Sequence, residues 1–197
     1  MTCSKADKDS VSLAAECLKG GGIAILPTDT VYGISGIADL PGRERMLRTA
    51  ERIYAMKGRP ESKPLIRLIA EPDDIFLYTD DNIPPEVLCR WPGAVTLIVG
   101  VRPEFSALWK SDTIAFRCPG DSWLRAVIKE CGAPVYSTSV NRSGKDALGT
   151  EHEIIAEFGD EADLFVTDGD KTRAVPSTLV RLEDGAVRVL RQGPVRF

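Results

Sequence analysis

The chain of 197 residues has a single histidine, His152, and this scarcity excludes much familiar enzyme chemistry. A metal site built on two histidines is impossible, and a Ser-His-Asp triad would depend on His152 alone. His152 stands in the polar stretch TEHE, which is typical of the first turn of a helix. The chemistry of this protein is therefore expected to rely on neither a histidine base nor a histidine-bound metal.

Cysteine patterns and long apolar runs are also missing. The five cysteines are odd in number, widely spaced and without a CxxC pair, so neither a disulfide framework nor a zinc site is expected. No apolar run approaches 18 residues, and no charged segment followed by an apolar one marks a signal peptide. The sequence predicts a cytoplasmic protein that does not enter a membrane.

The charge is acidic overall but unevenly distributed. The net charge of -4 argues against nucleic acid as the main direct partner. Between Arg43 and Arg67, however, eight cations stand against three anions; the cations are Arg43, Arg45, Arg48, Arg52, Lys57, Arg59, Lys63 and Arg67. This basic strip suits a small anionic ligand such as a nucleotide, although part of it is equally compatible with a solvated helix face.

Helical and extended patterns alternate from end to end, which predicts one domain over residues 1–197. Helices are expected over 11–18, 46–57, 121–131 and 150–158, the last with Thr150 as N-cap and Glu153 three residues later. Strands are expected over 23–26, 65–70, 94–100, 113–118, 134–139 and 163–167. Two β-rich runs joined at Asp184-Gly185 predict a closing hairpin. The expected fold class is α+β (mixed α/β), a twisted open mixed sheet flanked by helices.

Polar residues gather where these strands end. The segment PTDTVYG, from Pro27 to Gly33, follows a buried strand and presents Thr30 and Tyr32, either as ligand contacts or as a turn that satisfies its own backbone. The segment from Lys57 to Leu65 holds three cations stiffened by two prolines. These cations suit a phosphate chain, or they complement the dipole of the preceding helix.

Two further segments complete the polar set. Ser137 to Thr150 is rich in hydroxyls and glycine and could present N–H groups to an anion, or form a flexible loop. It is not a P-loop, because GxxxxGK[ST] occurs nowhere in the chain. Arg117 lies in a strand, where a buried arginine needs a partner, and Ser177 and Arg191 lie at the two ends of the hairpin.

Together and in this order, six segments resemble the YrdC family of threonylcarbamoyl-AMP synthases. They are PTDTVYG, Lys57-x-Arg59 with Pro64-Leu65, WPGAVTLIV, IAFR ending at Arg117, STSVNRSG and the closing STLV…LRQG, which span residues 23–193. The resemblance implies a twisted mixed sheet with a deep basic groove. It also implies the formation of threonylcarbamoyl-AMP and pyrophosphate from ATP, L-threonine and bicarbonate, with Mg²⁺ on the phosphates and no tightly bound organic cofactor. The product would pass to a tRNA-modification transferase complex, and a direct tRNA or double-stranded RNA contact is conceivable.

The resemblance also implies roles for individual residues. Threonine contacts fall on Thr30, Tyr32, Arg117, Ser137 and Ser177. ATP contacts fall on Arg59, Lys63, Thr113, Ser139, Asn141 and Arg191, and Lys57 with Arg59 forms the catalytic basic pair. Arg117 is the natural clamp for the threonine carboxylate. No protein ligand for the metal is implied.

This sequence departs from the family pattern where Asp121 and Leu68 replace histidines that some members carry, so the detail of the threonine pocket differs. Two other functions remain alternatives. One is a module that binds double-stranded RNA or tRNA. The other is a carbamoyl-transfer domain with a different acceptor, as in the hydrogenase maturation proteins that share the fold.

Overall fold

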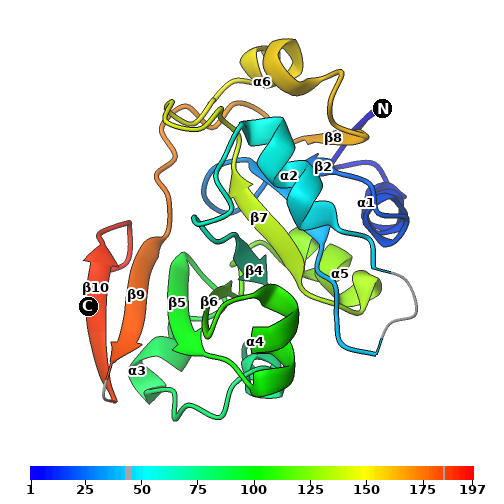
Figure 1. Cartoon of the computed structure of the whole chain (residues 1–197). Helices are drawn as coiled ribbons and strands as arrows, with labels where there is room; N and C mark the ends of the chain where they lie inside the picture. The colour runs from blue at the N-terminus through cyan, green and yellow to red at the C-terminus, as the bar shows by residue number, and fades with distance from the viewer. Residues whose placement is uncertain (43–45, 184) are drawn as a thin grey trace.

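The computed structural model describes residues 1–42, 46–183 and 185–197 (Figure 1). Its strands form one open mixed sheet in the order β1-β8-β2-β3-β7-β4-β6-β5-β9-β10, so that β1 and β10 are the edges. The strands are β1 (Thr2–Ser4), β2 (Ala24–Leu26), β3 (Gly33–Ile37), β4 (Ile66–Leu68), β5 (Val95–Gly100), β6 (Thr113–Arg117), β7 (Val135–Ser139), β8 (Leu164–Thr167), β9 (Thr178–Glu183) and β10 (Ala186–Arg191). This confirms the predicted fold class.

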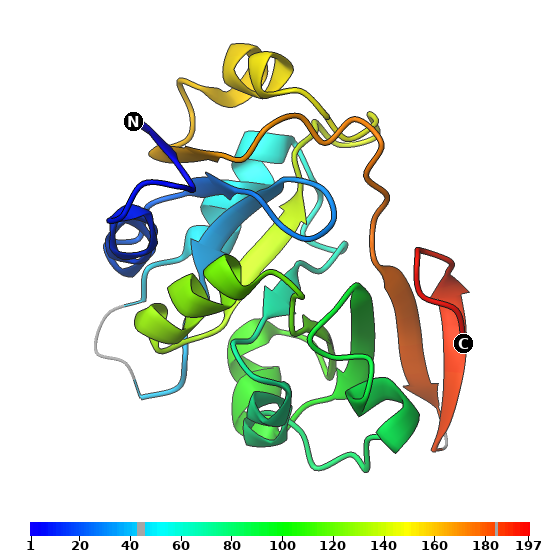
Figure 2. The ribbon, with the colours of Figure 1, turned by 180° about the vertical axis from the view of Figure 1, so that it is seen from behind.

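Helices cover both faces of the sheet. They are α1 (Ser10–Lys19), α2 (Thr49–Lys57), α3 (Pro85–Leu88), α4 (Pro103–Trp109), α5 (Ser122–Cys131) and α6 (Glu151–Phe158), with a 3₁₀ helix, η1, at Pro72–Leu77. Around β3 and β7, α2 covers one face of the sheet and α5 covers the other, as the two opposite views in Figures 1 and 2 show. Within the described residues, no helix is both long enough and apolar enough to cross a bilayer.

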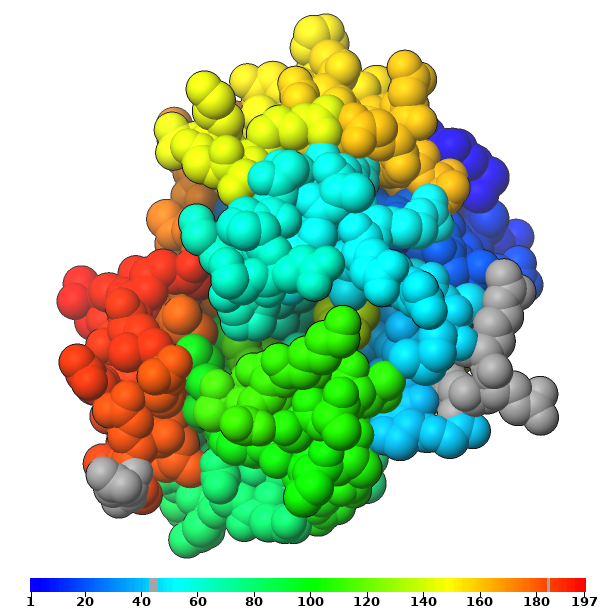
Figure 3. Space-filling model, viewed as in Figure 1, coloured from blue at the N-terminus to red at the C-terminus, as the bar shows by residue number. Residues whose placement is uncertain are grey.

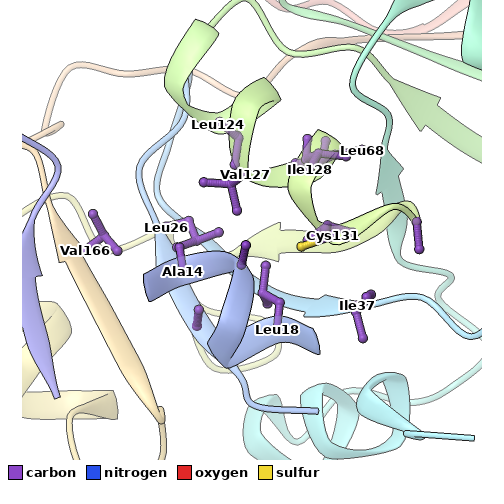
Figure 4. Close-up of a cluster of buried hydrophobic side chains, with 14 of the residues drawn as sticks. Ala14, Leu18, Leu26, Ile37, Leu68, Leu124, Val127, Ile128, Cys131 and Val166 are labelled. Atoms are coloured by element: carbon purple, nitrogen blue, oxygen red, sulfur yellow. The ribbon is translucent and has the colours of Figure 1, made fainter. Parts of the chain in front are cut away.

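Strand alternation explains why both faces carry helices. On β2, Ala24 and Leu26 pack with α1 and α5, whereas Ile25 packs on the other face with α2 and α6. Figure 4 shows the first of these clusters, where Leu18 of α1 and Leu124 of α5 meet side chains of the sheet. Because side chains alternate along a strand, an apolar residue at every position requires cover on both sides.

A third cluster supports the C-terminal half of the sheet. Val95 and Leu97 of β5, Phe116 of β6 and Val180 of β9 are fully buried in it. The ring of Tyr78 stacks on Phe116 with centroids 5.2 Å apart. This cluster fixes β9 beside β5 in parallel register, with Val95 opposite Thr178, and so places the hairpin against the rest of the sheet.

Most predicted elements are present, with instructive differences. The helix predicted from 46 begins at Thr49, because Arg48 has a left-handed φ of 52° and the Asp39 carboxylate accepts hydrogen bonds from Leu47 N and Arg48 N. The capping box of Thr150 and Glu153 is confirmed. The strand β3, with sequence GISGI, was missed because its two glycines weaken the extended pattern. Strand β1 and helices η1, α3 and α4 were also missed.

Two sequence predictions fall partly outside the described residues. They are the start of the basic strip, at Arg43 and Arg45, and the hairpin turn at Asp184. The strands that flank this turn, β9 and β10, pair antiparallel as expected, with Ala186 opposite Glu183.

Candidate active site

A cavity of about 160 Å³ opens where the loop 27–32 meets β3, β7, β4, β6 and the start of β9. We call it the central cavity. Eight of the twelve residues that the sequence singled out line it: Thr30, Tyr32, Arg59, Arg117, Ser137, Ser139, Ser177 and Arg191. Lys57, Lys63, Thr113 and Asn141 are not among its lining residues.

Among the three arginines that line the cavity, Arg117 makes the most hydrogen bonds. Its Nη2 donates to Asp29 Oδ1 at 2.6 Å, its Nη1 to Thr30 Oγ1 at 2.9 Å and its Nε to the carbonyl of Gly93 at 3.0 Å. Burial lowers the pKa of Arg117, and the Asp29 carboxylate opposes that shift. A guanidinium has five N–H groups, so one on each Nη is left for a ligand in the cavity.

The loop 27–32 is ordered by its own hydroxyls. Thr28 Oγ1 donates to the carbonyl of Val31 at 2.8 Å and accepts from Thr30 N at 2.9 Å, and the two threonine hydroxyls are 2.9 Å apart. The hydrogen bonds bear out the interpretation of this segment as a turn. It is a turn that satisfies its own backbone, and it also holds Thr30 at the cavity wall.

Tyr32 is fully buried, and its hydroxyl is used within the protein. The hydroxyl donates to Glu151 Oε1 or to the carbonyl of Gly169, at 3.1 and 2.9 Å, and accepts from Asp168 N at 2.7 Å. Burial is the main reason that the pKa of Tyr32 is raised. This side chain ties the loop 27–32 to the segment after β8, so its geometry suits positioning better than ligand contact.

Lys57 lies beneath the loop after β7. Its ammonium donates to the carbonyl of Ser139, and to the carbonyl and Oδ1 of Asn141 at 2.7 and 3.0 Å. Ser139 Oγ donates to the same Asn141 Oδ1 at 2.6 Å. Burial, reinforced by the charges of Arg59 and Arg142, lowers the pKa of Lys57 to about 7. All three N–H groups of the ammonium are therefore occupied, and Lys57 with Asn141 fixes the position of Ser139.

Arg59 reaches the cavity from the segment after α2. Its Nε donates to the carbonyl of Lys63 at 3.0 Å and its Nη2 to that of Pro64 at 3.2 Å, which folds the segment around the guanidinium. The glycine before it, Gly58, ends α2 in the left-handed conformation at φ 58°. Lys63 itself is exposed.

The hairpin contributes the opposite wall. Arg191 donates from Nε and Nη2 to the carbonyl of Ser177, at 3.3 and 2.9 Å, and the Ser177 hydroxyl is 2.7 Å from Thr96 Oγ1. Burial and the nearby charge of Arg117 both lower the pKa of Arg191. Three arginines thus face one small cavity, which makes it a site for anions.

Ser137 occupies the floor of the cavity, on β7. Among the described residues, its hydroxyl has no hydrogen-bond partner, so it is free for a ligand. Gly33 on the neighbouring strand makes this possible, because a Cβ there would lie 2.5 Å from Ser137 Oγ.

Thr113 lies at the other end of β6 from Arg117. The two residues are four apart, so they share a face of the strand and are separated by about 13 Å. Thr113 is exposed. Only a ligand that extends well beyond the central cavity would contact both.

Leu68 and Asp121, where the sequence departs from the family pattern, both have defined structural roles. Leu68 is 3% exposed and forms part of the apolar wall of the cavity with Ile66. Asp121 caps α5 by accepting from Leu124 N at 3.1 Å, and it pairs with Lys5 at 2.6 Å.

Sequence reasoning missed Asp29, which binds both Arg117 and the backbone N of Gly120, the latter at 2.9 Å. The only available signal was its place in PTDTVYG, which cannot reveal a partner 88 residues away.

Among the described residues, no three His, Cys, Asp or Glu side chains gather to hold a metal ion. The donors of this cavity are cationic or neutral, which suits phosphates and carboxylates.

Comparisons with known proteins show the family of this chain. The family model Sua5_yciO_yrdC, described as telomere recombination, matches residues 16–193. The threonylcarbamoyl-AMP synthase of Idiomarina loihiensis is 32% identical over 179 residues, which cover 87% of this chain and 92% of that protein. A threonylcarbamoyl-AMP synthase of Pseudoalteromonas translucida is 27% identical, over 92% of this chain and 97% of the relative.

Solved structures share the fold. Pyrococcus abyssi Sua5 in complex with L-threonine superposes with a TM-score of 0.82 at 26% identity, covering 97% of this chain. The chain spans 56% of the length of that Sua5. Escherichia coli YciO superposes with a TM-score of 0.80 at 22% identity, covering 98% of this chain and 94% of YciO.

Proposed function

Because the chain belongs to the Sua5/YciO/YrdC family, we propose that it is a threonylcarbamoyl-AMP synthase. The enzyme would form L-threonylcarbamoyl-AMP and pyrophosphate from ATP, L-threonine and bicarbonate, and the product would serve the threonylcarbamoyladenosine modification of tRNA. The observation that carries the proposal is the central cavity, where hydroxyl groups and three arginines face one another.

The inner end of the cavity suits threonine. Arg117 has one unused N–H on each Nη, which matches the two oxygens of a carboxylate. The hydroxyls of Thr30 and Ser137 can bond to the amino acid, and Ser177 adds a hydroxyl on the opposite wall. The threonine methyl group would meet the apolar wall that includes Leu68.

The outer end suits the triphosphate. Arg59 and Arg191 would bind phosphate oxygens, and Ser139 would add a hydroxyl contact. Lys63 and Thr113 lie beyond the cavity, so they would contact only the extended parts of ATP. We assign Lys57 and Asn141 to positioning Ser139, and Tyr32 to positioning the loop 27–32, because their polar groups are bonded within the protein.

The reaction would proceed by positioning and charge neutralisation. The threonine amino group attacks bicarbonate and water leaves, which gives a carbamate. An oxygen of the carbamate then attacks the α-phosphorus of ATP, and pyrophosphate leaves. The arginines would stabilise the negative charge on the phosphates. Mg²⁺ bound to the phosphates would supply further neutralisation, and the described residues offer it no carboxylate cluster of their own.

The adenylate would then pass to a tRNA-modification transferase complex, and we place the reaction in the cytoplasm. The cavity is small and is built for anionic groups of a compact ligand, which favours a metabolite site over a surface for double-stranded RNA.

The deciding test is which substrates must be present together. Pyrophosphate release should require ATP, Mg²⁺, threonine and bicarbonate at once, whereas an enzyme that activates the amino-acid carboxylate would need no bicarbonate. Serine should be a poorer substrate by about 10–200-fold, because it lacks one methyl group. The product should carry label from both bicarbonate and threonine. Rapid pyrophosphate release in bicarbonate-free buffer, or tight RNA binding without turnover, would contradict the proposal.

A further inference from the structure

A second and larger cavity, of about 580 Å³, lies on the other face of the sheet. It is bounded by α2 and the following segment on one side and by the end of α4 on the other. Figure 3 shows the molecule hollowed between these two segments, drawn in cyan and green. We call it the Arg67 cavity, after the residue at its floor.

Strand β4 separates the two cavities. Ile66 and Leu68 face the central cavity, whereas Leu65 and Arg67 line the Arg67 cavity, as alternation along a strand requires. Pro64 lines both. The Arg67 cavity is therefore not an extension of the proposed substrate site.

Arg67 is 4% exposed and has no carboxylate partner among the residues that the structure describes. Its Nη1 makes one long hydrogen bond, of 3.4 Å, to the carbonyl of Leu65. Its Nε is buried without a hydrogen-bond partner. Arg125 and Arg181 also have an unpaired Nε, but each of them has a carboxylate within ion-pair distance.

Aromatic rings hold this guanidinium in place. Its central carbon lies 4.0 Å from the ring centroid of Trp109 and 5.0 Å from that of Tyr136. Trp109 is itself fixed, because its Nε1 donates to the carbonyl of Asp39 at 2.9 Å. Burial lowers the pKa of Arg67, because little solvent remains to stabilise its charge, and Tyr136 and Tyr54 oppose that shift. Cation–π contacts and the polar contact with Tyr136 offset part of the cost, but no carboxylate among the described residues neutralises the charge.

We propose that the Arg67 cavity binds a small organic anion, with a carboxylate or phosphate held by the guanidinium of Arg67. A guanidinium carries its N–H donors in one plane, which suits the oxygens of such an anion. The volume exceeds that of an inorganic ion and falls in the range of small-molecule sites, and Tyr54 and Trp109 offer flat apolar surface to the body of the ligand. This inference does not depend on the proposed reaction.

Calorimetric titration of the whole protein with phenyl phosphate and benzoate tests this, with benzamide as the neutral counterpart of benzoate. The two anions should bind saturably and benzamide at least tenfold more weakly. Arg67→Met should weaken anion binding by about ten- to a hundredfold, since a charge-assisted pair is lost. Arg67→Lys should retain part of the affinity, because it keeps the charge and loses the fork.

Competition between benzoate and the proposed substrates shows which of the two cavities binds the anion. Saturating ATP and threonine should leave benzoate binding unchanged, and Arg67→Met should still bind ATP. Absence of saturable anion binding to the wild-type protein would overturn the proposal, as would equal binding by Arg67→Met or displacement of benzoate by ATP. If Arg67→Met does not fold, the wild-type titrations, the competition and Arg67→Lys decide the question by the same criteria.

Discussion

The ion pair between Arg117 and Asp29 gives the sharpest stability prediction. Asp29→Asn removes the charge of the carboxylate that lies 2.6 Å from Arg117 Nη2, while keeping the size of the side chain. The side chain of Arg117 is 6% exposed and that of Asp29 is 21% exposed, so little solvent is available to replace the lost partner. The new amide would also turn an N–H group toward a donor, either Arg117 or Gly120 N.

The magnitude follows from this burial. Removing one member of a buried pair costs about 3–5 kcal/mol, and the partial exposure of Asp29 favours the lower end, about 3 kcal/mol. For a chain of this length that loss corresponds to a fall in Tm of about 6–12 °C. Urea denaturation at pH 7 measures the free energy, and a thermal scan measures Tm.

A double-mutant cycle isolates the pair. In Arg117→Met the buried cation is absent, so adding Asp29→Asn should cost much less than it does alone, with a coupling energy of about 1.5–3 kcal/mol. The matched control is Asp80→Asn at the exposed pair with Arg102, where Asp80 is 77% exposed and about 0–1 kcal/mol is expected. A loss below about 1 kcal/mol in Asp29→Asn, or strict additivity in the cycle, would refute the assignment of this pair as a structural support of the cavity.

Three further outcomes are expected. Arg59→Ala should weaken ATP binding about ten- to a hundredfold in calorimetry while the protein stays folded, and unchanged affinity would remove Arg59 from the site. Gly33→Ala should cost about 1–3 kcal/mol in urea denaturation and weaken threonine binding, because the new Cβ would lie 2.5 Å from Ser137 Oγ; a neutral effect would contradict this. The pKa of Lys57 is about 7 in the folded protein, against 10.5 for an ordinary lysine. Between these two pH values the unfolded chain keeps a proton that the folded protein has lost. The free energy of unfolding should therefore rise between pH 7 and pH 10.5. That rise should be shallower in Lys57→Met, and equal slopes would show that Lys57 does not titrate in this window.

Local chemistry in the sequence determined most of the elements. Thr150 and Glu153 predicted the start of α6 correctly, because a capping box acts within four residues. The apolar run at 23–26 predicted β2, and its alternating residues did face two separate cores. The fold class followed from the alternation of helices and strands. Strand β3 escaped notice because glycine carries no apolar side chain to show the period.

Most of the residues that the sequence selected do line the central cavity, since polar residues at strand ends converge when the strands share a sheet. Tertiary structure alone decided what each side chain does there. Lys57 and Tyr32 belong to the right segments, yet the fold turns their polar groups onto the backbone of neighbouring loops. Asp29 pairs with Arg117, whereas Arg67 lies against Trp109 and Tyr136 with no carboxylate partner among the described residues. Strand register decides this, because it brings together or separates residues that lie far apart in the chain. Composition and spacing do not reveal such contacts, because the contacts form only when the strands pair in register and the sheet buries its two faces.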